Sequence, residues 1–285
     1  LFWMAYGGAG EYRAAQYGDP APTDEEVAGR TVRIVDFSYP RAELERIAAA
    51  AADLVVLDHH RTAQADCEGL AFAEFDMDRS GARMAWDYLR PTLHLQRVYY
   101  GAGERIEQVR RLEAVRQVVN YVQDRDLWRW QLPDSRQVNA ALESYPRRSI
   151  AEDAGLWVDH VLAVDLSDHV ADGWAIERVK TRQLEILKAK AWAAELDGHA
   201  AAVAQAPLLQ SELGHELLAD PTSGADVAVL WWQKPDGEFV YSLRSRDGGD
   251  EPDVSAIAKE RGGGGHHHAA GFASKQAPWE LMARL

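Results

Sequence analysis

A short polar run whose residue types could do chemistry follows an apolar segment in the first quarter of the chain. Residues 54–57 (LVVL) precede Asp58, His59, His60 and Arg61, so a carboxylate, two imidazoles and a guanidinium occupy consecutive positions. Side chains of these types can together bind a charged ligand. The same run could instead be a helix N-cap followed by two surface histidines. The motif alone leaves both interpretations open.

A second unusual string, GGGGHHHAAGF at residues 262–272, lies near the end of the chain. Glycine lets backbone N–H groups approach an anion closely, and a helix starting behind the glycines would add the positive end of its dipole. We therefore expect a phosphate cradle, with a helix of small residues behind it and His267 and His268 on its surface. A purification tag is disfavoured, because the string is internal and has only three histidines.

The strands around the first motif should place two carboxylates, those of Asp36 and Asp58, at the same end of a sheet. The segment TVRIVDFSYP indicates a strand that ends at Asp36, residues 41–52 have the composition of a helix, and residues 53–60 indicate a second strand. A strand, a helix and a strand in this order predict a parallel pair with a crossover. Asp36 and Asp58 would then finish their strands at the same edge, where open α/β sheets bind ligands.

The rest of the chain divides into a helical part and a second mixed part. Residues 79–90 and 105–128 indicate helices, and the second carries the acidic pair Asp124 and Asp126 near its end. Residues 172–198 resemble one long amphipathic helix that Gly198 would end. Beyond it we expect a strand, a helix and two strands joined by a PDG hairpin turn, at residues 199–207, 208–220, 225–233 and 238–246.

The balance of acidic and basic residues narrows the kinds of ligand that the protein can bind. Thirty-one basic residues against forty-five acidic ones give a net charge of -14, which disfavours a protein that coats long nucleic acid. Bound divalent ions would still let an acidic protein bind phosphate at one site.

No apolar run approaches the ~20 residues that span a bilayer. The single cysteine, Cys67, forms no intramolecular disulfide, so a reducing, cytoplasmic location is expected.

Five strings in this order resemble the DHH/DHHA1 phosphoesterase superfamily, which includes RecJ-like exonucleases and oligoribonucleases. They are IVDFSY, VVLDHHRTA, DRDLW, SLRSR and GGGGHHHAAGF. The resemblance implies an α/β fold of two domains. A parallel-sheet DHH domain would occupy residues 1–145, a helical linker residues 146–197, and a smaller mixed-sheet DHHA1 domain residues 198–285. The aspartate motif that precedes these strings in the superfamily is missing, and we expect it in a segment before Leu1.

The resemblance also implies a site with two Mn²⁺ or Mg²⁺ ions. Asp36 would bridge the ions and His59 would bind one of them, while Asp124, favoured over Asp126, would complete that site. Asp58 and His60 would be ligands or neighbours of ligands with a part in catalysis. Carboxylates mixed with imidazole suit Mn²⁺. The implied substrate contacts are Arg244, Arg246, Gly263, Gly264, Gly265 and His266.

The implied function is metal-dependent hydrolysis of short single-stranded RNA or DNA, because the acidic surface and the absence of an added nucleic-acid module favour short substrates. One alternative is a phosphatase or phosphodiesterase of small nucleotides, dinucleotides or pyrophosphate. Another is a nucleotide-binding module with an incomplete metal site. No membrane partner is expected, and a homodimer is the candidate assembly. Weaker candidates for contacts are Arg147, Arg148, Trp128, Trp130, Trp231 and Trp232, most of these tryptophans being expected in the core.

Overall fold

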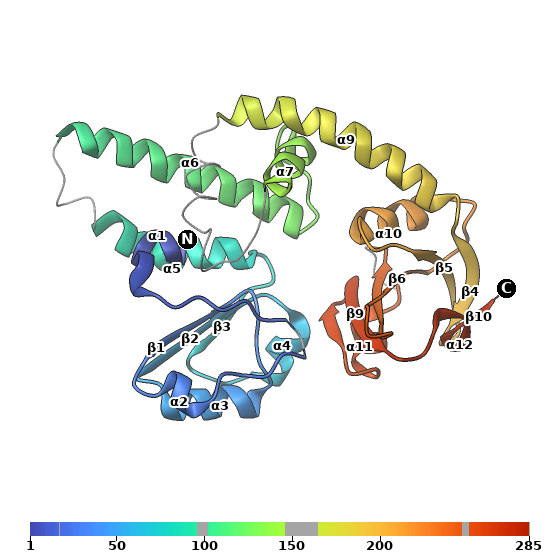
Figure 1. The fold of residues 1–285 in the computed structure, drawn as a ribbon, viewed down its shortest axis with the longest axis horizontal. Coiled ribbons are helices and arrows are strands. Elements are labelled where there is room, and N and C mark those ends of the chain that lie inside the picture. The colour runs from blue at the N-terminus through green and yellow to red at the C-terminus, as the bar shows by residue number, and fades with distance from the viewer. Residues whose placement is uncertain (17, 96–101, 146–164, 247–250, 285) are drawn as a thin grey trace. The chain divides into compact units, whose positions relative to one another are not determined.

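The computed structural model describes residues 1–16, 18–95, 102–145, 165–246 and 251–284. The chain divides into two compact units, Leu1–Glu177 and Arg178–Leu285. The division falls within the helix α9 (Leu166–Lys188). The first unit has a parallel sheet and the second has a separate mixed sheet, which confirms the predicted α/β fold of two domains (Figure 1).

The sheet of the first unit consists of three parallel strands in the order in which they occur in the chain. They are β1 (Thr31–Val35), β2 (Asp53–Asp58) and β3 (Ala73–Phe75). The helix α3 (Arg41–Ala50) connects β1 to β2, and α4 (Arg61–Asp66) follows β2. The predicted parallel pair and its crossover helix are confirmed. The short strand β3 was not predicted.

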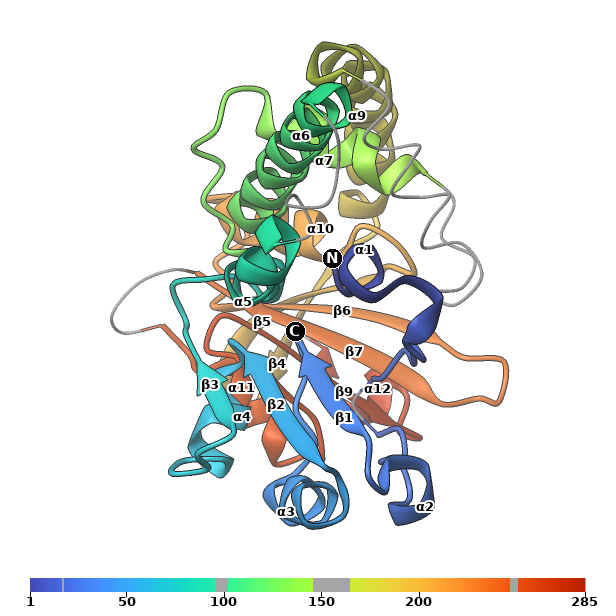
Figure 2. The ribbon, with the colours of Figure 1, turned by 90° about the vertical axis from the view of Figure 1, so that its left-hand side faces the viewer.

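Helices cover both faces of this sheet (Figure 2). On one face lie α2 (Asp24–Val27) and α3, whose Leu44 and Ile47 are fully buried in a core with Ile34 and Val56. On the other face lies α5 (Gly81–Leu95), as predicted for residues 79–90. Because both faces are covered, β2 can be apolar from Leu54 to Leu57, between Asp53 and Asp58.

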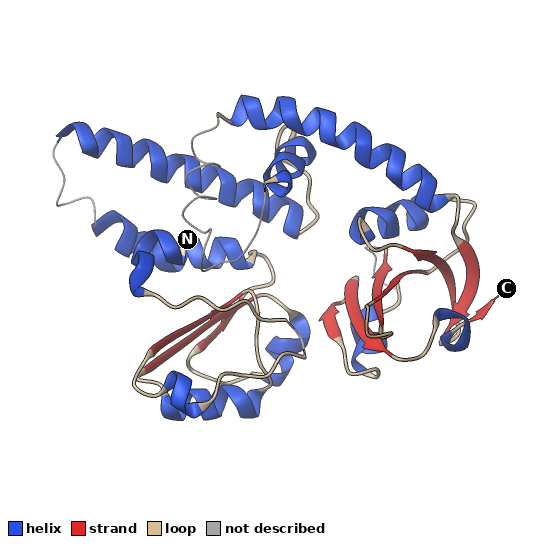
Figure 3. Cartoon of the chain, in the orientation of Figure 1, coloured by secondary structure: helices blue, strands red, loops and turns tan. Residues whose placement is uncertain are grey.

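A helical layer packs on α5. It contains α1 (Phe2–Tyr6), the 3₁₀ turn η1 (Gly7–Ala9), α6 (Ala102–Asp126) and α7 (Ser135–Ser144). The predicted helix at residues 105–128 is confirmed as α6, which ends at Asp126. Figure 3 shows this helical layer above the strands of the first unit. None of the described helices is both long and apolar enough to cross a membrane.

The second unit is built on a seven-stranded sheet in the order β10-β4-β5-β6-β7-β9-β8. Only the β5–β6 pair is parallel. Its strands are β4 (Trp192–Leu196), β5 (His199–Gln205), β6 (Val227–Gln233), β7 (Phe239–Ser245), β8 (Gly264–His266), β9 (Ala269–Ser274) and β10 (Ala283–Arg284). The helix α10 (Gln210–Ala219) packs on one face and α11 (Val254–Lys259) on the other, while α12 (Pro278–Leu281) precedes β10. The predicted elements at residues 199–246 are confirmed.

The predicted helix at residues 172–198 was too long. The helix α9 ends at Lys188, and residues 192–196 form the strand β4, which pairs with β5. Ala194 and Leu196 alternate into the core while their neighbours face outward, so the segment has the period of a strand. Gly198, with φ +83, belongs to the β4–β5 turn and does not end a helix.

The predicted helix behind the four glycines was also wrong. The glycines lead into β8, which forms a hairpin with β9, and His267 and His268 lie in the turn between these strands. A Cβ atom at Gly263 would lie 2.0 Å from the Gly271 carbonyl oxygen. This hairpin therefore needs glycine for close backbone packing, independently of any anion.

Candidate metal centre at the strand ends

Asp36, directly after β1, stands at the edge of the parallel sheet. Its N–H donates to the Leu57 carbonyl at 2.8 Å, and its φ of +59 turns the chain away from the strand. A Cβ atom at Gly81 would lie 2.4 Å from the Asp36 carboxylate oxygen Oδ1. Glycine at the start of α5 thus provides the space that the Asp36 side chain occupies.

The loop before Gly81 ties the start of α5 to the end of α6. Ser80 is fully buried, and its N–H donates to the Gln123 side-chain oxygen at 3.2 Å. Arg129, just after α6, donates from Nη2 to the Asp78 carbonyl at 2.9 Å. These bonds hold the end of α6 next to the loop that accommodates Asp36.

Asp58 is fully buried and organises the two histidines that follow it. Its Oδ1 accepts hydrogen bonds from the backbone N–H of His59 at 2.8 Å and from the His60 backbone N–H at 3.3 Å, and it lies 2.7 Å from His60 Nδ1. Its Oδ2 accepts from the Ser38 hydroxyl at 2.7 Å. Burial alone would raise the pKa of Asp58, but the contacts with His60, Ser38 and the His59 backbone lower it below its usual range.

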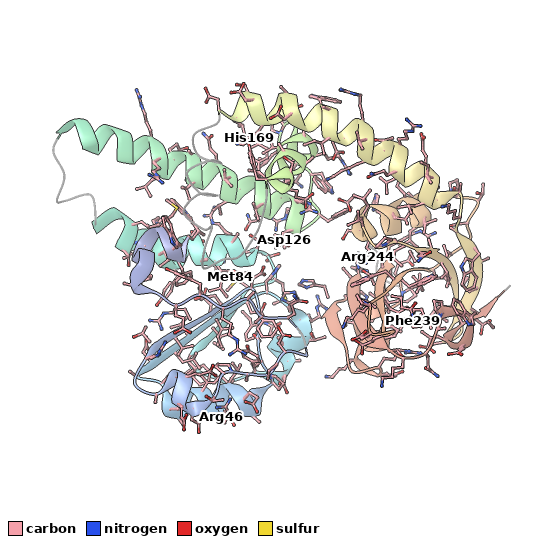
Figure 4. The ribbon with its side chains drawn as sticks, viewed as in Figure 1. Arg46, Met84, Asp126, His169, Phe239 and Arg244 are labelled. Atoms are coloured by element: carbon pink, nitrogen blue, oxygen red, sulfur yellow. The ribbon has the colours of Figure 1, made fainter. Side chains whose placement is uncertain are left out.

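His59 lies between two carboxylates. Its Nε2 is 3.0 Å from Asp36 Oδ1 and 3.4 Å from Asp126 Oδ2. Burial opposes the charged form of the ring, yet the two carboxylates, with Asp58, raise the pKa of His59. Burial and the Asp36 charge raise the pKa of Asp126, which is labelled in Figure 4 at the end of α6. His59 is 2% exposed, so the interpretation of a helix cap followed by surface histidines does not describe it.

This constellation has the donor set of a divalent-cation site. One ligand atom each from Asp36, His59 and Asp126 lies within 4.8 Å of the others, and the same holds for Asp36, Asp58 and His60. Carboxylate oxygens with imidazole nitrogen suit Mn²⁺, and oxygen-rich sets also suit Mg²⁺. Asp36 belongs to both groups. The residues present therefore fit a metal centre in which Asp36 would be a ligand in each group.

The two aspartates at the end of α6 face different surroundings. Asp124 is 5% exposed, and its carboxylate accepts the backbone N–H groups of Gln131 at 2.9 Å and Leu132 at 3.2 Å. The carboxylate beside His59 and Asp36 is that of Asp126. The resemblance implied Asp124 as the ligand from this helix. The geometry favours Asp126 instead.

Arg244 is in β7 of the second unit, and its side chain contacts α10; Figure 4 labels it. Its Nη1 donates to the Ser242 hydroxyl and the Leu243 carbonyl, and its Nη2 donates to the Ser211 hydroxyl at 2.8 Å. A Cβ atom at Gly214 would lie 2.7 Å from the Arg244 stem. Burial lowers the pKa of Arg244 to about 10, although the charge of the Glu212 carboxylate acts in the opposite direction.

The remaining predicted substrate residues have distinct surroundings. Arg246 Nε donates to the Leu218 carbonyl at 3.1 Å, so this arginine stabilises the end of α10. His266 is the last residue of β8, and Gly264 and Gly265 are in the same strand, while Gly263 directly precedes it. His268 Nδ1 lies 3.0 Å from the Ser245 hydroxyl. Arg147 and Arg148 fall outside the described residues.

Sequence reasoning missed two supports of the candidate metal centre. Ser38 stands two residues after Asp36, and Gly81 stands at the predicted start of a helix, but only the contacts of these residues reveal their roles. Asp126 was weighed and ranked second. The spacing of Asp124 and Asp126 placed both near the end of the helix, and the choice between them depends on how the following loop folds back.

Comparisons with known proteins place this geometry in a wider context. No protein-family model matches the chain. An uncharacterized protein of Acanthamoeba polyphaga mimivirus is 26% identical over 257 residues, which cover 87% of this chain. The chain spans about half the length of that relative, 54%.

Solved structures give the fold. The DHH domain of a member of the s1p family of ribosomal proteins is similar over 90% of this chain and 66% of that chain, at 14% identity and a TM-score of 0.52. The chain has the fold of a DHH-domain protein. An exopolyphosphatase-related protein from Bacteroides fragilis is similar at 14% identity over 90% of this chain and 70% of that chain, with a TM-score of 0.46. In this DHH fold the Asp58-His59-His60 motif lies at the carboxyl ends of the parallel strands.

Proposed function

We propose that this chain is a metal-dependent phosphodiesterase that hydrolyses short oligonucleotides, with a metal centre built on Asp36, Asp58, His59 and Asp126. The observation that carries the proposal is the convergence of three carboxylates and two imidazoles at the strand ends of a DHH fold. Two Mn²⁺ or Mg²⁺ ions bound there would bind the scissile phosphate and lower the pKa of a bound water.

The protein's own residues then have separate tasks. Asp36, His59 and Asp126 would hold cations through their carboxylate oxygens and the imidazole of His59, which needs neutral imidazole and ionised carboxylates. Asp58 already accepts four hydrogen bonds, so it mainly fixes the orientation of His60 through Nδ1. His60, oriented in this way, would be the residue that moves a proton at the reacting phosphate. The lowered pKa of Asp58 keeps it ionised for this task.

The second unit would hold the substrate away from the reacting phosphate. Arg244 is a partly buried guanidinium whose hydrogen bonds go only to neutral oxygens among the described residues. Its Nη1 is fully used by Ser242 and Leu243, which leaves N–H donors on the Nε and Nη2 side for a phosphate. Arg244 with the glycine strand and His266 is our candidate for this contact.

The test begins with protein freed of metal by a chelator. We expect Mn²⁺ to restore hydrolysis of a labelled dinucleotide, with Mg²⁺ less effective and Ca²⁺ little, because an imidazole ligand favours the softer ion and Ca²⁺ prefers more oxygen ligands. Longer RNA and DNA, a cyclic dinucleotide and pyrophosphate are assayed in parallel. Hydrolysis of pyrophosphate alone would favour the phosphatase alternative, and hydrolysis of none would favour a binding module.

Variants of the motif test the assignment directly. We expect Asp58→Ala and His59→Ala each to abolish hydrolysis at saturating Mn²⁺ while circular dichroism remains that of the wild type. Both residues lie at the sheet edge, so their loss should remove the centre without emptying a hydrophobic core. Unchanged turnover in either variant would contradict the proposed site.

A further inference from the structure

Two tryptophans follow Asp126 in the loop between α6 and α7. Trp128 has a φ of +54 and Trp130 a φ of +52, a conformation that side chains with a Cβ atom rarely adopt. The loop is nevertheless firmly tied. The Asp124 carboxylate accepts the N–H groups of Gln131 and Leu132, and the Tyr121 hydroxyl donates to the Pro133 carbonyl at 3.0 Å. These bonds hold the backbone of the loop that directly follows Asp126 and carries both rings.

The two rings meet edge to face, and one arginine lies over the second ring. The ring centroids of Trp128 and Trp130 are 5.0 Å apart at an interplanar angle of 76°. The Arg136 guanidinium lies over the Trp130 ring, 4.4 Å from its centroid. Both tryptophans are partly exposed and Arg136 is exposed, so solvent reaches this group. We call Trp128, Trp130 and Arg136 the aromatic step.

Arg136 has a charge that the fold does not require. It stands in the first turn of α7, where the positive end of the helix dipole disfavours a cation. Among the residues that the structure describes, no carboxylate pairs with Arg136, although the chain has a net charge of -14. The contact with Trp130 is a cation–π contact at the guanidinium carbon, and the N–H donors around that carbon can bind an anion.

We propose that the aromatic step is a nucleotide subsite, in which one nucleobase stacks on the Trp128–Trp130 pair and Arg136 binds a phosphate of the same substrate. This inference rests on the proposed phosphodiesterase function and adds that the substrate carries a base near the reacting phosphate. Aromatic rings bind every base through its π face, and an arginine can bind phosphate with two N–H groups. A base-free phosphate chain would gain nothing from the two rings.

Binding without turnover tests the subsite first. A 5′-phosphorylated dinucleotide carrying 2-aminopurine is added to the full chain in EDTA, and quenching of its fluorescence reports stacking. We expect the wild type to quench the probe and Trp128→Ala to weaken its affinity at least about tenfold, while Trp128→Phe keeps most of the affinity. Arg136→Gln, at an exposed position, should also weaken binding. Trp279→Ala, an exposed tryptophan of the second unit, is the matched control and should change nothing.

Turnover separates this inference from the proposed function. With Mn²⁺, Trp128→Ala should raise KM about tenfold for the dinucleotide but leave KM unchanged for the same diester without bases. A wild type that quenches the probe but hydrolyses no diester would refute the phosphodiesterase and keep the subsite. Wild-type quenching and KM in Trp128→Ala, Trp128→Phe and Arg136→Gln, with unchanged melting temperatures, would refute the subsite. Loss of folding in Trp128→Ala moves the decision to the other two variants.

Discussion

At the residue scale, two neighbouring acids have different surroundings, one beside the candidate metal ligands and the other in the backbone hydrogen bonds of a loop. Asp124 and Asp126 are two positions apart on α6, yet Asp124 accepts backbone N–H groups of the following loop and Asp126 lies beside His59. The pattern DRDLW predicts that an acid from this helix belongs to the centre. It does not predict which one, because the choice depends on how the following loop folds back to place the N–H groups of Gln131 and Leu132 on Asp124.

Paired asparagine substitutions should separate these two roles. Asp126→Asn removes a ligand charge, so we expect Mn²⁺ affinity, measured by isothermal titration calorimetry, to fall at least about tenfold with little loss of stability. Asp124→Asn weakens two buried hydrogen bonds, so we expect unfolding free energy to fall by about 1–3 kcal/mol with Mn²⁺ affinity changed less than about threefold. The reverse pattern would return the ligand role to Asp124.

Cys67, at the end of α4, offers a probe of the same region. The thiol is 2% exposed, and burial raises its pKa to about 11. A raised pKa means that the folded state keeps its proton while the unfolded thiol ionises near ~8.5, so this group's contribution to stability is lost between ~8.5 and about 11 as pH rises.

We therefore expect the folded protein at pH 8 to react with Ellman's reagent at least about a hundredfold more slowly than the protein in denaturant. Since the chain has one cysteine, the signal needs no correction for other thiols. Fast labelling of the native protein would show that the end of α4, a few residues from His60, opens readily.

At the element scale, predictions succeeded where the hydrophobic pattern alone decides the structure. The strand β1 is rich in β-branched residues and precedes Asp36, while β2 has an apolar run, Leu54 to Leu57, that is followed by Asp58. The pattern failed for the glycine string, because glycine carries no side chain that could indicate a period. Only the close packing of Gly263 against Gly271 shows that the segment is a hairpin.

The start of α5 provides a test of how one element positions another. Gly81→Ala should raise helix propensity by up to ~1 kcal/mol, so the helix itself gains. The added Cβ would nevertheless meet the Asp36 side chain at 2.4 Å and must displace it. We expect Mn²⁺ affinity to fall at least about tenfold while the melting temperature changes by only a few degrees. Ala82→Gly, which weakens the same helix without touching Asp36, is the control and should keep Mn²⁺ affinity.

At the scale of the whole molecule, we assign hydrolysis to the sheet of the first unit and substrate binding to the sheet of the second. The first unit brings carboxylates and imidazoles together at the ends of parallel strands. The second unit has Arg244 and the glycine hairpin on a mixed sheet with its own core. An acidic protein can use such an arrangement, because bound cations at one site and a partly buried arginine at another supply positive charge where a phosphate chain needs it.

Substitutions in the second unit should therefore change the use of oligonucleotides and leave metal binding intact. We expect Arg244→Gln and His266→Ala each to lower kcat/KM for an oligonucleotide at least ~10-fold, the scale of one lost charge-assisted contact of ~1.4 kcal/mol. Mn²⁺ affinity should match the wild type, and hydrolysis of bis(p-nitrophenyl) phosphate, too small to need a remote contact, should fall much less. Arg244→Lys keeps the charge without the planar fork and should recover only part of the loss. Equal losses for both substrates would mean that these residues serve folding or the reaction itself, and no loss for either would remove the second unit from substrate binding.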